Sequence, residues 1–378
     1  MPRRISSPFM TQTIPFFNYP AVFSQREQEY LQAAEGVLRR GAYIMQKDLF
    51  DFEDALAHYV GSRQAIGLAD GTMAITLGLL AAGLRGGDEV ILPSHTFIAT
   101  GAAVHHAGGI PVLCDCGNDH LIEPDSVKRL LTKKTRAIVP VQLNGRAANM
   151  DPILQIANEH DLFIVEDSCQ ALGSKFKGRQ AGTFGKAGAF SFYPSKTLGC
   201  FGDGGALVTD DDSIAEKVRL LRDHGRSSTG DVTCFGFNAR LDNLQAAILN
   251  VKLKHYQQDI SKRRELAGRY QERLADVKEL RLPPPPVDGG EHFDIFQNYE
   301  IEAERRDELR EFLKQNGVAT ILQWGGKTIH QFSDLNLKAD CPYTEEMTKR
   351  FMLLPLNTSL SLDGIGYIAE QIQRFYAR

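Results

Sequence analysis

The feature that most constrains the fold is a regular alternation of short apolar runs and helix-period stretches between about residues 60 and 210. The runs predicted as strands are Ala65–Leu68, Val90–Leu92, Pro111–Cys114, Ala137–Val141, Leu162–Val165, Ala189–Phe192 and Ala206–Val208. The helices predicted between them include Met73–Ala82, Pro124–Leu131 and Pro152–Glu159. Strands that alternate with helices imply crossover connections and a mostly parallel sheet. We therefore expect an α/β domain whose functional site lies beyond the carboxyl ends of the strands.

The rest of the chain is predicted to add helices and a second, smaller domain. Further helical stretches are expected at Gln25–Arg39, Leu49–Tyr59 and Leu241 to about Ala275. Four consecutive prolines from Pro283 and a glycine pair from Gly289 then interrupt any regular element. A strand, a helix and a strand are expected after them at Phe296–Ile301, Arg306–Gln315 and Ala319–Leu322. The sequence therefore predicts a large domain at residues 1–258, with the N-terminal helices, and a small α+β domain at residues 259–378.

Composition excludes several classes of protein. The 378 residues are 43% hydrophobic and 24% charged, with a net charge of −4, which argues against disorder and against a nucleic-acid partner. No apolar run reaches the roughly 20 residues of a membrane-spanning helix. The Arg3-Arg4 pair is not followed by the apolar core of an export signal, so a cytoplasmic protein is expected. The scattered cysteines fit a reducing compartment, and Cys114 and Cys116 lack the second ligand pair of a metal site.

The sharpest local feature is Lys196, which follows a predicted strand ending at Pro194 and precedes a glycine-rich turn. A lysine at the mouth of a sheet can leave bulk water, and desolvation lowers the pKa of its amine and frees it as a nucleophile or base. A solvent-exposed loop lysine is the alternative. Lys196 alone does not decide between them.

Two other motifs become informative when they are considered together with Lys196. Asp167 ends another predicted strand, where it could pair with a cationic ring nitrogen or simply cap a turn. Gly71 and Thr72 begin a predicted helix, where free N–H groups could bind a phosphate or a side chain could cap the helix. A phosphate pocket, a strand-end aspartate and a strand-end lysine together match the needs of pyridoxal 5′-phosphate.

The order of these motifs resembles the pyridoxal-phosphate sugar aminotransferases of the DegT/DnrJ/EryC1/StrS family over nearly the whole chain. The segments that carry the resemblance are GAYIMQKDLFDFE, ADGTMAITLGL, GDEVILPSHTFIAT, VQLNGRAANMD, VEDSCQALGS, FSFYPSKTLGCFGDGGALVT, LRDHG and FGFNARLDNLQAAIL. The resemblance implies the type I (aspartate aminotransferase) fold, with a mostly parallel seven-stranded sheet in a large domain and a smaller α+β domain. It also implies at least a homodimer whose active sites are completed by the neighbouring subunit.

The resemblance also implies roles for individual residues. Lys196 matches the lysine that holds the cofactor as a Schiff base, Asp167 the partner of the pyridine nitrogen, and Gln170 the neighbour of the 3′-oxygen. The remaining matches are the ring-stacking Phe97, the phosphate contacts Gly71, Thr72 and Ser191, and Asn238, which reaches the phosphate bound by the partner subunit. Arg240 lies either near that shared site or in a structural position at the interface. No metal ligand is expected.

The chain departs from the family pattern at several positions. Asp70 stands where Ser or Asn is more usual, and its acid group must turn away from a phosphate. Asn144 replaces a frequent Tyr, Gln142 a frequent His, and residues 323–327 differ from the commoner segment. These departures are expected to face the substrate, and His330 either contacts it or is structural.

The implied reaction moves the amino group of L-glutamate to the cofactor, giving pyridoxamine 5′-phosphate, and then to a nucleotide-linked keto sugar. Lys196 would carry the proton as general base and then acid, with ping-pong kinetics. Its presence favours transamination over the sugar dehydration of relatives that carry a histidine there. The segment PSKTLGCFGDGG slightly favours a sugar with a C3 ketone over one with a C4 ketone as the acceptor. Two alternatives stay open: a cyclitol ketone as acceptor, and a cofactor-binding regulator without turnover.

Overall fold

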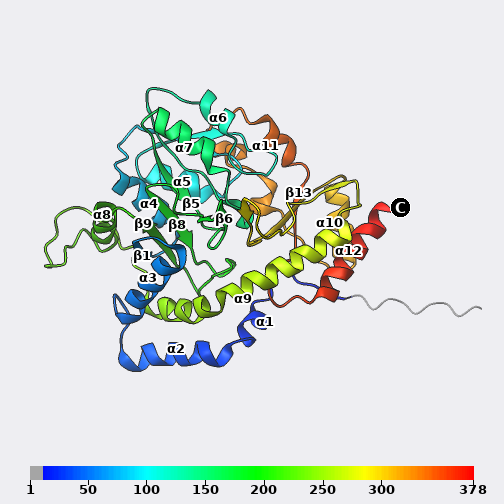
Figure 1. Cartoon of the computed structure of the whole chain (residues 1–378), viewed down its shortest axis with the longest axis horizontal. Helices are drawn as coiled ribbons and strands as arrows, with labels where there is room; N and C mark the ends of the chain where they lie inside the picture. The colour runs from blue at the N-terminus through cyan, green and yellow to red at the C-terminus, as the bar shows by residue number, and fades with distance from the viewer. Residues whose placement is uncertain (1–11) are drawn as a thin grey trace, which may run out of the picture.

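The central feature of the computed structural model is a seven-stranded sheet with the strand order β1-β9-β8-β5-β4-β2-β3 (Figure 1). The structure describes residues 12–378, so Arg3 and Arg4 lie outside the described residues. The strands are β1 (Gln64–Leu68), β2 (Glu89–Pro93), β3 (Ile110–Cys114), β4 (Thr135–Ile138), β5 (Phe163–Asp167), β8 (Ala187–Ser191) and β9 (Gly205–Thr209). Every strand predicted between residues 60 and 210 overlaps one of them.

The pairing directions place the carboxyl ends of most strands on one edge. Strands β3, β2, β4, β5 and β8 pair in parallel, whereas β9 runs antiparallel to both β8 and β1. The predicted mostly parallel α/β sheet is therefore confirmed. Because β5 and β8 are parallel neighbours, their last residues, Asp167 and Ser191, come to the same edge.

Helices cover both faces of the sheet, and alternate strand residues explain how. These helices are α4 (Gly71–Ala82), α5 (Ile98–His106), α6 (Pro124–Arg129), α7 (Met150–Glu159) and α8 (Asp212–Arg222). In β2, Val90 and Leu92 join the core formed with α4, α5 and α8, whereas Ile91 joins the core formed with α6 and α7. Successive side chains of a strand point to opposite faces, so a wholly apolar strand is buried on both.

The N-terminal helices and one very long helix form the lower part of the molecule in Figure 1. They are α1 (Tyr19–Ser24), α2 (Glu27–Arg40), α3 (Lys47–Val60) and α9 (Asn243–Leu274). In α9, Leu249 and Tyr256 pack in a core with α3 and the sheet, whereas Leu266 and Tyr270 belong to the core of the C-terminal part. The predicted domain boundary at residues 258 and 259 falls within this continuous helix and stays a prediction.

The C-terminal part contains a three-stranded sheet of order β10-β12-β13. Its elements are β10 (Leu280–Arg281), β12 (Tyr299–Ala303), α10 (Arg306–Gln315), α11 (Pro342–Met347), β13 (Phe351–Leu354) and α12 (Leu362–Tyr376). The α10 prediction is confirmed in both bounds. The strand predicted at Ala319–Leu322 is wrong, because Ile321 forms only a single bridge to Leu353. A positive φ at Trp324 and Gly325 then turns the chain away.

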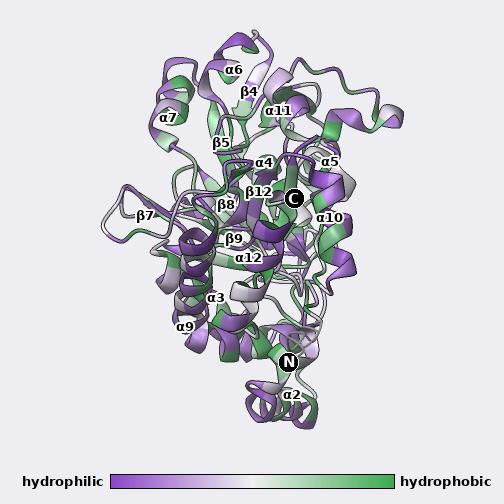
Figure 2. Cartoon of the chain, turned by 90° about the vertical axis from the view of Figure 1, so that its right-hand side faces the viewer, coloured by the Kyte–Doolittle hydropathy of each residue, from purple (hydrophilic) through white to green (hydrophobic). Residues whose placement is uncertain are grey.

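Two smaller features complete the fold. Strands β6 (Lys175–Phe176), β7 (Arg179–Gln180) and β11 (His292–Phe293) form a short sheet that the sequence did not predict. Figure 2 shows the central strand β5 in green and a largely purple α9, as expected for a buried strand and a helix with an exposed polar side. Among residues 12–378, no helix combines the length and the apolar character needed to cross a membrane.

Candidate active site

A cavity of about 620 Å³ lies at the carboxyl ends of β5 and β8 and the N-terminus of α4. The predicted site residues that line it are Gly71, Thr72, Phe97, Asp167, Gln170, Ser191 and Lys196. Residues from four separate segments of the chain therefore meet where the sheet topology predicted a site. Its size suits a cofactor together with part of a substrate.

Lys196 sits in a tight turn that a residue of the C-terminal part of the chain holds in place. Strand β8 ends at Ser191, three residues earlier than predicted, and the Lys196 N–H donates to the Tyr193 carbonyl at 2.8 Å. Gln297 brackets the lysine, accepting from the Thr197 N–H at 2.7 Å and donating to the Ser195 carbonyl at 2.8 Å. Burial lowers the pKa of the Lys196 amine, which favours the neutral, nucleophilic form.

Asp167 is held in a single orientation. It is the last residue of β5 and is 6% exposed. One carboxylate oxygen accepts from the Thr100 hydroxyl at 2.7 Å, and the other accepts from the Cys169 N–H at 3.1 Å. A carboxylate fixed in this way can stabilise a cationic ring nitrogen in the cavity.

The N-terminus of α4 is shaped to accept an anion. The Asp70 carboxylate caps the helix and accepts from the Met73 N–H at 2.8 Å, so the acid group is committed to the backbone. A Cβ at Gly71 would lie 2.6 Å from the Cys169 Sγ, and a Cβ at Gly205 would lie 2.4 Å from the Asp70 carbonyl. Both glycines therefore allow backbone to approach where any side chain would fill the cradle.

An aromatic ring and an amide complete the cavity. Phe97 is 51% exposed and lies 6.5 Å from the Trp324 ring, with an angle of 34° between the planes. The Gln170 Oε1 accepts from the Asn144 N–H at 2.9 Å and from the Asn298 Nδ2 at 3.3 Å. The remaining hydrogen-bonding group of Gln170 is then its Nε2 donor.

Comparison with known proteins decides the family. The sequence profile of the DegT/DnrJ/EryC1/StrS aminotransferase family matches residues 24–373. This chain belongs to that family. The dTDP-3-amino-3,4,6-trideoxy-alpha-D-glucose transaminase of Streptomyces venezuelae is 39% identical, covering 98% of this chain and 100% of the relative. The UDP-N-acetyl-3-dehydro-alpha-D-glucosamine 3-aminotransferase of Acidithiobacillus ferrooxidans is 35% identical, covering 97% and 99%.

Solved structures agree with this assignment. Streptomyces venezuelae DesV in complex with a ketimine intermediate aligns with a TM-score of 0.93 at 34% identity, covering 97% of this chain and 100% of that one. NtdA of Bacillus subtilis, solved with bound pyridoxamine phosphate, aligns with a TM-score of 0.89 at 30% identity, covering 100% of this chain and 86% of that one. The expected aminotransferase fold is confirmed.

The residues present fit pyridoxal 5′-phosphate, the cofactor of these aminotransferases. The glycine-shaped cradle at α4 suits its phosphate, the fixed Asp167 carboxylate suits its ring nitrogen, and the Lys196 amine suits its aldehyde. The Asp70 carboxylate next to this cradle accepts from the Met73 N–H as a helix cap, so it is turned to the backbone of α4.

Asn238 is not brought to the cavity. It is exposed, and its Oδ1 accepts from the Arg240 Nη2 at 2.6 Å, while the Arg240 Nη1 donates to Asp223 at 2.8 Å. This position is compatible with a role toward a second subunit, which stays a prediction.

The residues at which this chain departs from the family pattern lie in different surroundings, and only some of them face the cavity. The expectation that Gln142 faces the substrate is wrong, because it is fully buried, donates to Glu166 at 2.8 Å and accepts from the Ala148 N–H at 2.7 Å. Gln323 does line the cavity. His330 is a structural histidine here, since its Nδ1 lies 2.5 Å from the Ser94 hydroxyl.

Several site residues escaped the sequence interpretation. They are Thr100, Cys169, Gln297 and Asn298. The only signal for the last two is an adjacent pair of amide side chains within the strand predicted at Phe296–Ile301, and nothing local connects that pair to Lys196.

Proposed function

We propose that this protein transfers the amino group of L-glutamate to the C3 ketone of a nucleotide-linked sugar, with pyridoxal 5′-phosphate as cofactor. The single observation that carries the proposal is the convergence of Lys196, Asp167 and the α4 N-terminus in one cavity of a DegT-family chain. The C3 position is supported by the relatives, whose names specify 3-amino or 3-oxo sugars.

When bound, the cofactor supplies an electron sink that makes the carbon bearing the amino group acidic. Asp167 supports this by holding negative charge against the ring nitrogen. Lys196 would hold the aldehyde of the bound cofactor, and its amine, when free, would serve as the general base and acid that moves the proton of the donor's α-carbon. Burial lowers the pKa of this amine, which favours its neutral form.

We further propose a homodimer, with Asn238 reaching the partner's phosphate site, and a cytoplasmic location. The exposed position of Asn238 outside the cavity of its own chain supports the first. The absence of a spanning helix among the described residues is compatible with the second.

The lysine assignment is tested by borohydride reduction of the cofactor-loaded protein followed by peptide mapping. We expect the reduced adduct on Lys196, and its loss in Lys196→Ala. Lys186→Ala, which removes an exposed lysine of the same region, is the matched control and should keep the adduct. An adduct on another lysine, or steady turnover of Lys196→Ala with glutamate, would refute the assignment.

The acceptor is tested by single-turnover reaction of the pyridoxamine form with 3-keto and 4-keto sugars linked to UDP and dTDP, and with a keto cyclitol. Fastest conversion of a 3-keto sugar nucleotide is expected. Preference for the keto cyclitol would support the alternative in which a cyclitol ketone is the acceptor. If glutamate leaves the visible absorbance of the bound cofactor unchanged, the protein is a cofactor-binding regulator and the proposal fails.

A further inference from the structure

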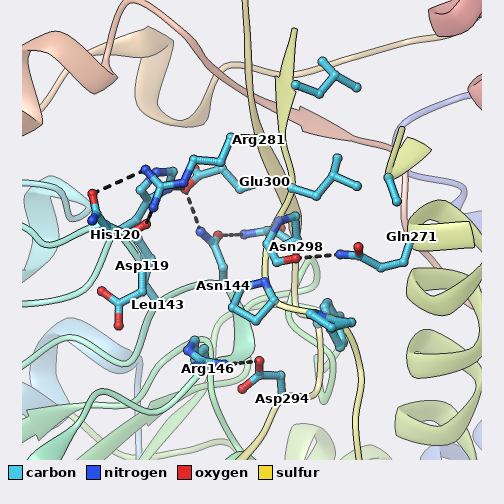
Figure 3. A pocket seen from close by; sticks show the side chains of 18 residues that line it. Asp119, His120, Leu143, Asn144, Arg146, Gln271, Arg281, Asp294, Asn298 and Glu300 are labelled. Atoms are coloured by element: carbon cyan, nitrogen blue, oxygen red, sulfur yellow. Dashed lines mark hydrogen bonds and ion pairs between the residues drawn. The ribbon is translucent and has the colours of Figure 1, made fainter. Parts of the chain in front are cut away.

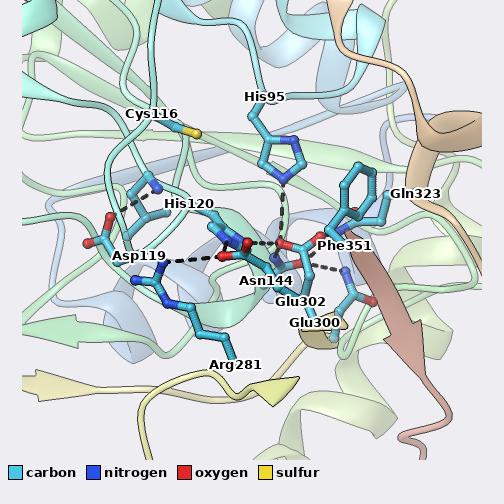
Figure 4. A network of polar contacts seen from close by, with 12 residues as sticks. His95, Cys116, Asp119, His120, Asn144, Arg281, Glu300, Glu302, Gln323 and Phe351 are labelled. Atoms are coloured by element: carbon cyan, nitrogen blue, oxygen red, sulfur yellow. Dashed lines mark hydrogen bonds and ion pairs between the residues drawn. The ribbon is translucent and has the colours of Figure 1, made fainter. Parts of the chain in front are cut away.

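A buried carboxylate, Glu300, lies behind the active site between the small sheet and the large domain (Figure 4). It belongs to β12 and is 4% exposed. Its Oε1 lies 2.6 Å from the His120 Nδ1 and 3.5 Å from the His95 Nε2, both of the large domain. Burial would raise the pKa of this carboxyl, but the charge of the two histidines and the hydrogen bond of His120 hold it well below its ordinary value.

The ionised carboxylate can only accept hydrogen bonds, which fixes the amides around it. Asn144 must present its Nδ2, which donates to the Glu300 Oε1 at 3.0 Å. Gln323 must present its Nε2, which donates to the Glu300 Oε2 at 2.8 Å. The Asn144 Oδ1 consequently faces away and accepts from the Gln323 Nε2 at 2.8 Å and the Asn298 Nδ2 at 2.9 Å.

The same fixed orientation of amide donors and acceptors continues to the cofactor cavity. Asn298 presents its Nδ2 to the Asn144 Oδ1 and also to the Gln170 Oε1, at 3.3 Å. The Asn144 N–H donates to that same Gln170 oxygen at 2.9 Å. With its oxygen engaged twice, Gln170 offers its Nε2 donor to the cavity, the polarity that an oxygen acceptor of the cofactor requires.

We propose that Glu300 is a positioning residue that sets, through the amides of Asn144 and Asn298, the direction in which Gln170 faces the cofactor. This inference rests on the proposed function, because it takes Gln170 as the donor to the 3′-oxygen. We call this chain of hydrogen bonds from Glu300 to Gln170 the relay. Asn144, one of its members, stands where a tyrosine is frequent in the family.

Packing alone does not hold these amides. A second cavity, of about 580 Å³, also borders these amides (Figure 3). Asn144, Asn298 and Glu300 line it, and Asn298 lines the cofactor cavity as well. A side chain that borders a cavity has fewer packing neighbours to hold it, so the hydrogen bonds that start at Glu300 restrain the orientation of Asn144 and Asn298.

A bound metal ion is the competing explanation for the close approach of His95, His120 and Glu300. Donor atoms of His95, His120 and Glu300 lie within 4.8 Å of one another, and neither ring nitrogen of His95 has a hydrogen-bond partner among the described residues. However, both Glu300 oxygens already accept from amides, and His120 bridges Glu300 to Glu302. A metal would have to break these bonds, so the relay is the better account.

The test compares Glu300→Gln with Glu302→Gln. Both glutamates lie on β12 and contact His120, but Glu302 pairs with Arg281 and Arg350 instead of the amides. An amide at position 300 can donate as well as accept, so Asn144 and the amides beyond it lose their fixed direction. We expect Glu300→Gln to raise the cofactor dissociation constant about five- to tenfold, the value of about one hydrogen bond, and Glu302→Gln to leave it within about twofold.

Thermal stability and a Gln170→Ala variant separate the possible outcomes. Both glutamate variants are expected to lower the melting temperature, so only cofactor binding and the absorbance spectrum distinguish positioning from a structural role. Equal effects of the two variants on cofactor binding would overturn the relay. If Gln170→Ala binds the cofactor normally, the role of Gln170 in the proposed function fails instead. Stoichiometric zinc in the purified holoenzyme, lost in Glu300→Gln, would replace the relay by a metal site.

Discussion

The pH dependence of stability gives a direct measure of the buried cluster around His120. Its Nδ1 lies 2.6 Å from Glu300 and its Nε2 lies 3.1 Å from Glu302. Burial lowers the pKa of the imidazole, but the hydrogen bonds and charges of the two glutamates outweigh it and raise the pKa from 6.5 to about 9. The difference between the folded and ordinary values corresponds to about 3 kcal/mol of folding free energy.

The sign follows from the protonated form being favoured in the folded state. The stabilisation is complete below the unfolded pKa of 6.5 and is lost as the pH rises through about 9. Neither neighbouring carboxylate titrates in this window, because the pKa of Glu302 is lowered to about 2 and that of Glu300 is lowered further. Tyr343, which contacts Glu302, has its pKa raised to about 12.

Urea unfolding of the parent protein and of His120→Gln, followed by circular dichroism, would test this reasoning. The variant should be less stable than the parent by about 3 kcal/mol near pH 6, and the difference should shrink by most of that amount near pH 10. A difference of the same size at both pH values would refute it, because His120 would then act through packing and neutral hydrogen bonds.

Three further outcomes are expected. Gly71→Ala should lower the free energy of unfolding by about 1–3 kcal/mol and weaken phosphate and cofactor binding, since its Cβ would lie 2.6 Å from the Cys169 Sγ. Calorimetry and cofactor titration would show both effects. Unchanged binding would contradict a phosphate site at Gly71. Glu53→Gln should cost about 3–5 kcal/mol in urea unfolding because it leaves the Arg222 guanidinium, 2% exposed, without its carboxylate; a loss below about 1 kcal/mol would contradict this. Asn238→Ala should speed cofactor loss on gel filtration, and retention equal to the parent would count against a shared site.

The parts of the site that follow from local sequence were predictable. Strand ends and helix starts are set by periodicity, so Asp167, Lys196 and Gly71 could be placed at one edge of a parallel sheet before their contacts were known. The resemblance to a known family then gave each of them a chemical role. The helix α10 was predictable for the same local reason, since its apolar residues recur at helical spacing.

Long-range hydrogen bonds set the parts that were not predictable. Gln297 bonds to the residues on either side of Lys196 from about a hundred positions along the chain, on the far side of the long helix α9 in sequence. Gln142 was expected at the substrate because its chemistry differs from the family, yet its amide satisfies the buried Glu166. Sequence shows which residue differs, whereas the partner that explains the difference is a property of the packed structure.

The tight approach at Gly205 has a consequence for anyone who would redesign this protein. A Cβ at Gly205 would meet the backbone of Asp70, whereas a Cβ at Gly71 would meet the side chains of Cys169 and Ser191. Libraries that vary the floor of the cavity would mostly yield misfolded protein, because backbone atoms have no alternative rotamer to adopt. Variation is better directed at the half-buried Trp324, which lines the same cavity from the C-terminal part of the chain.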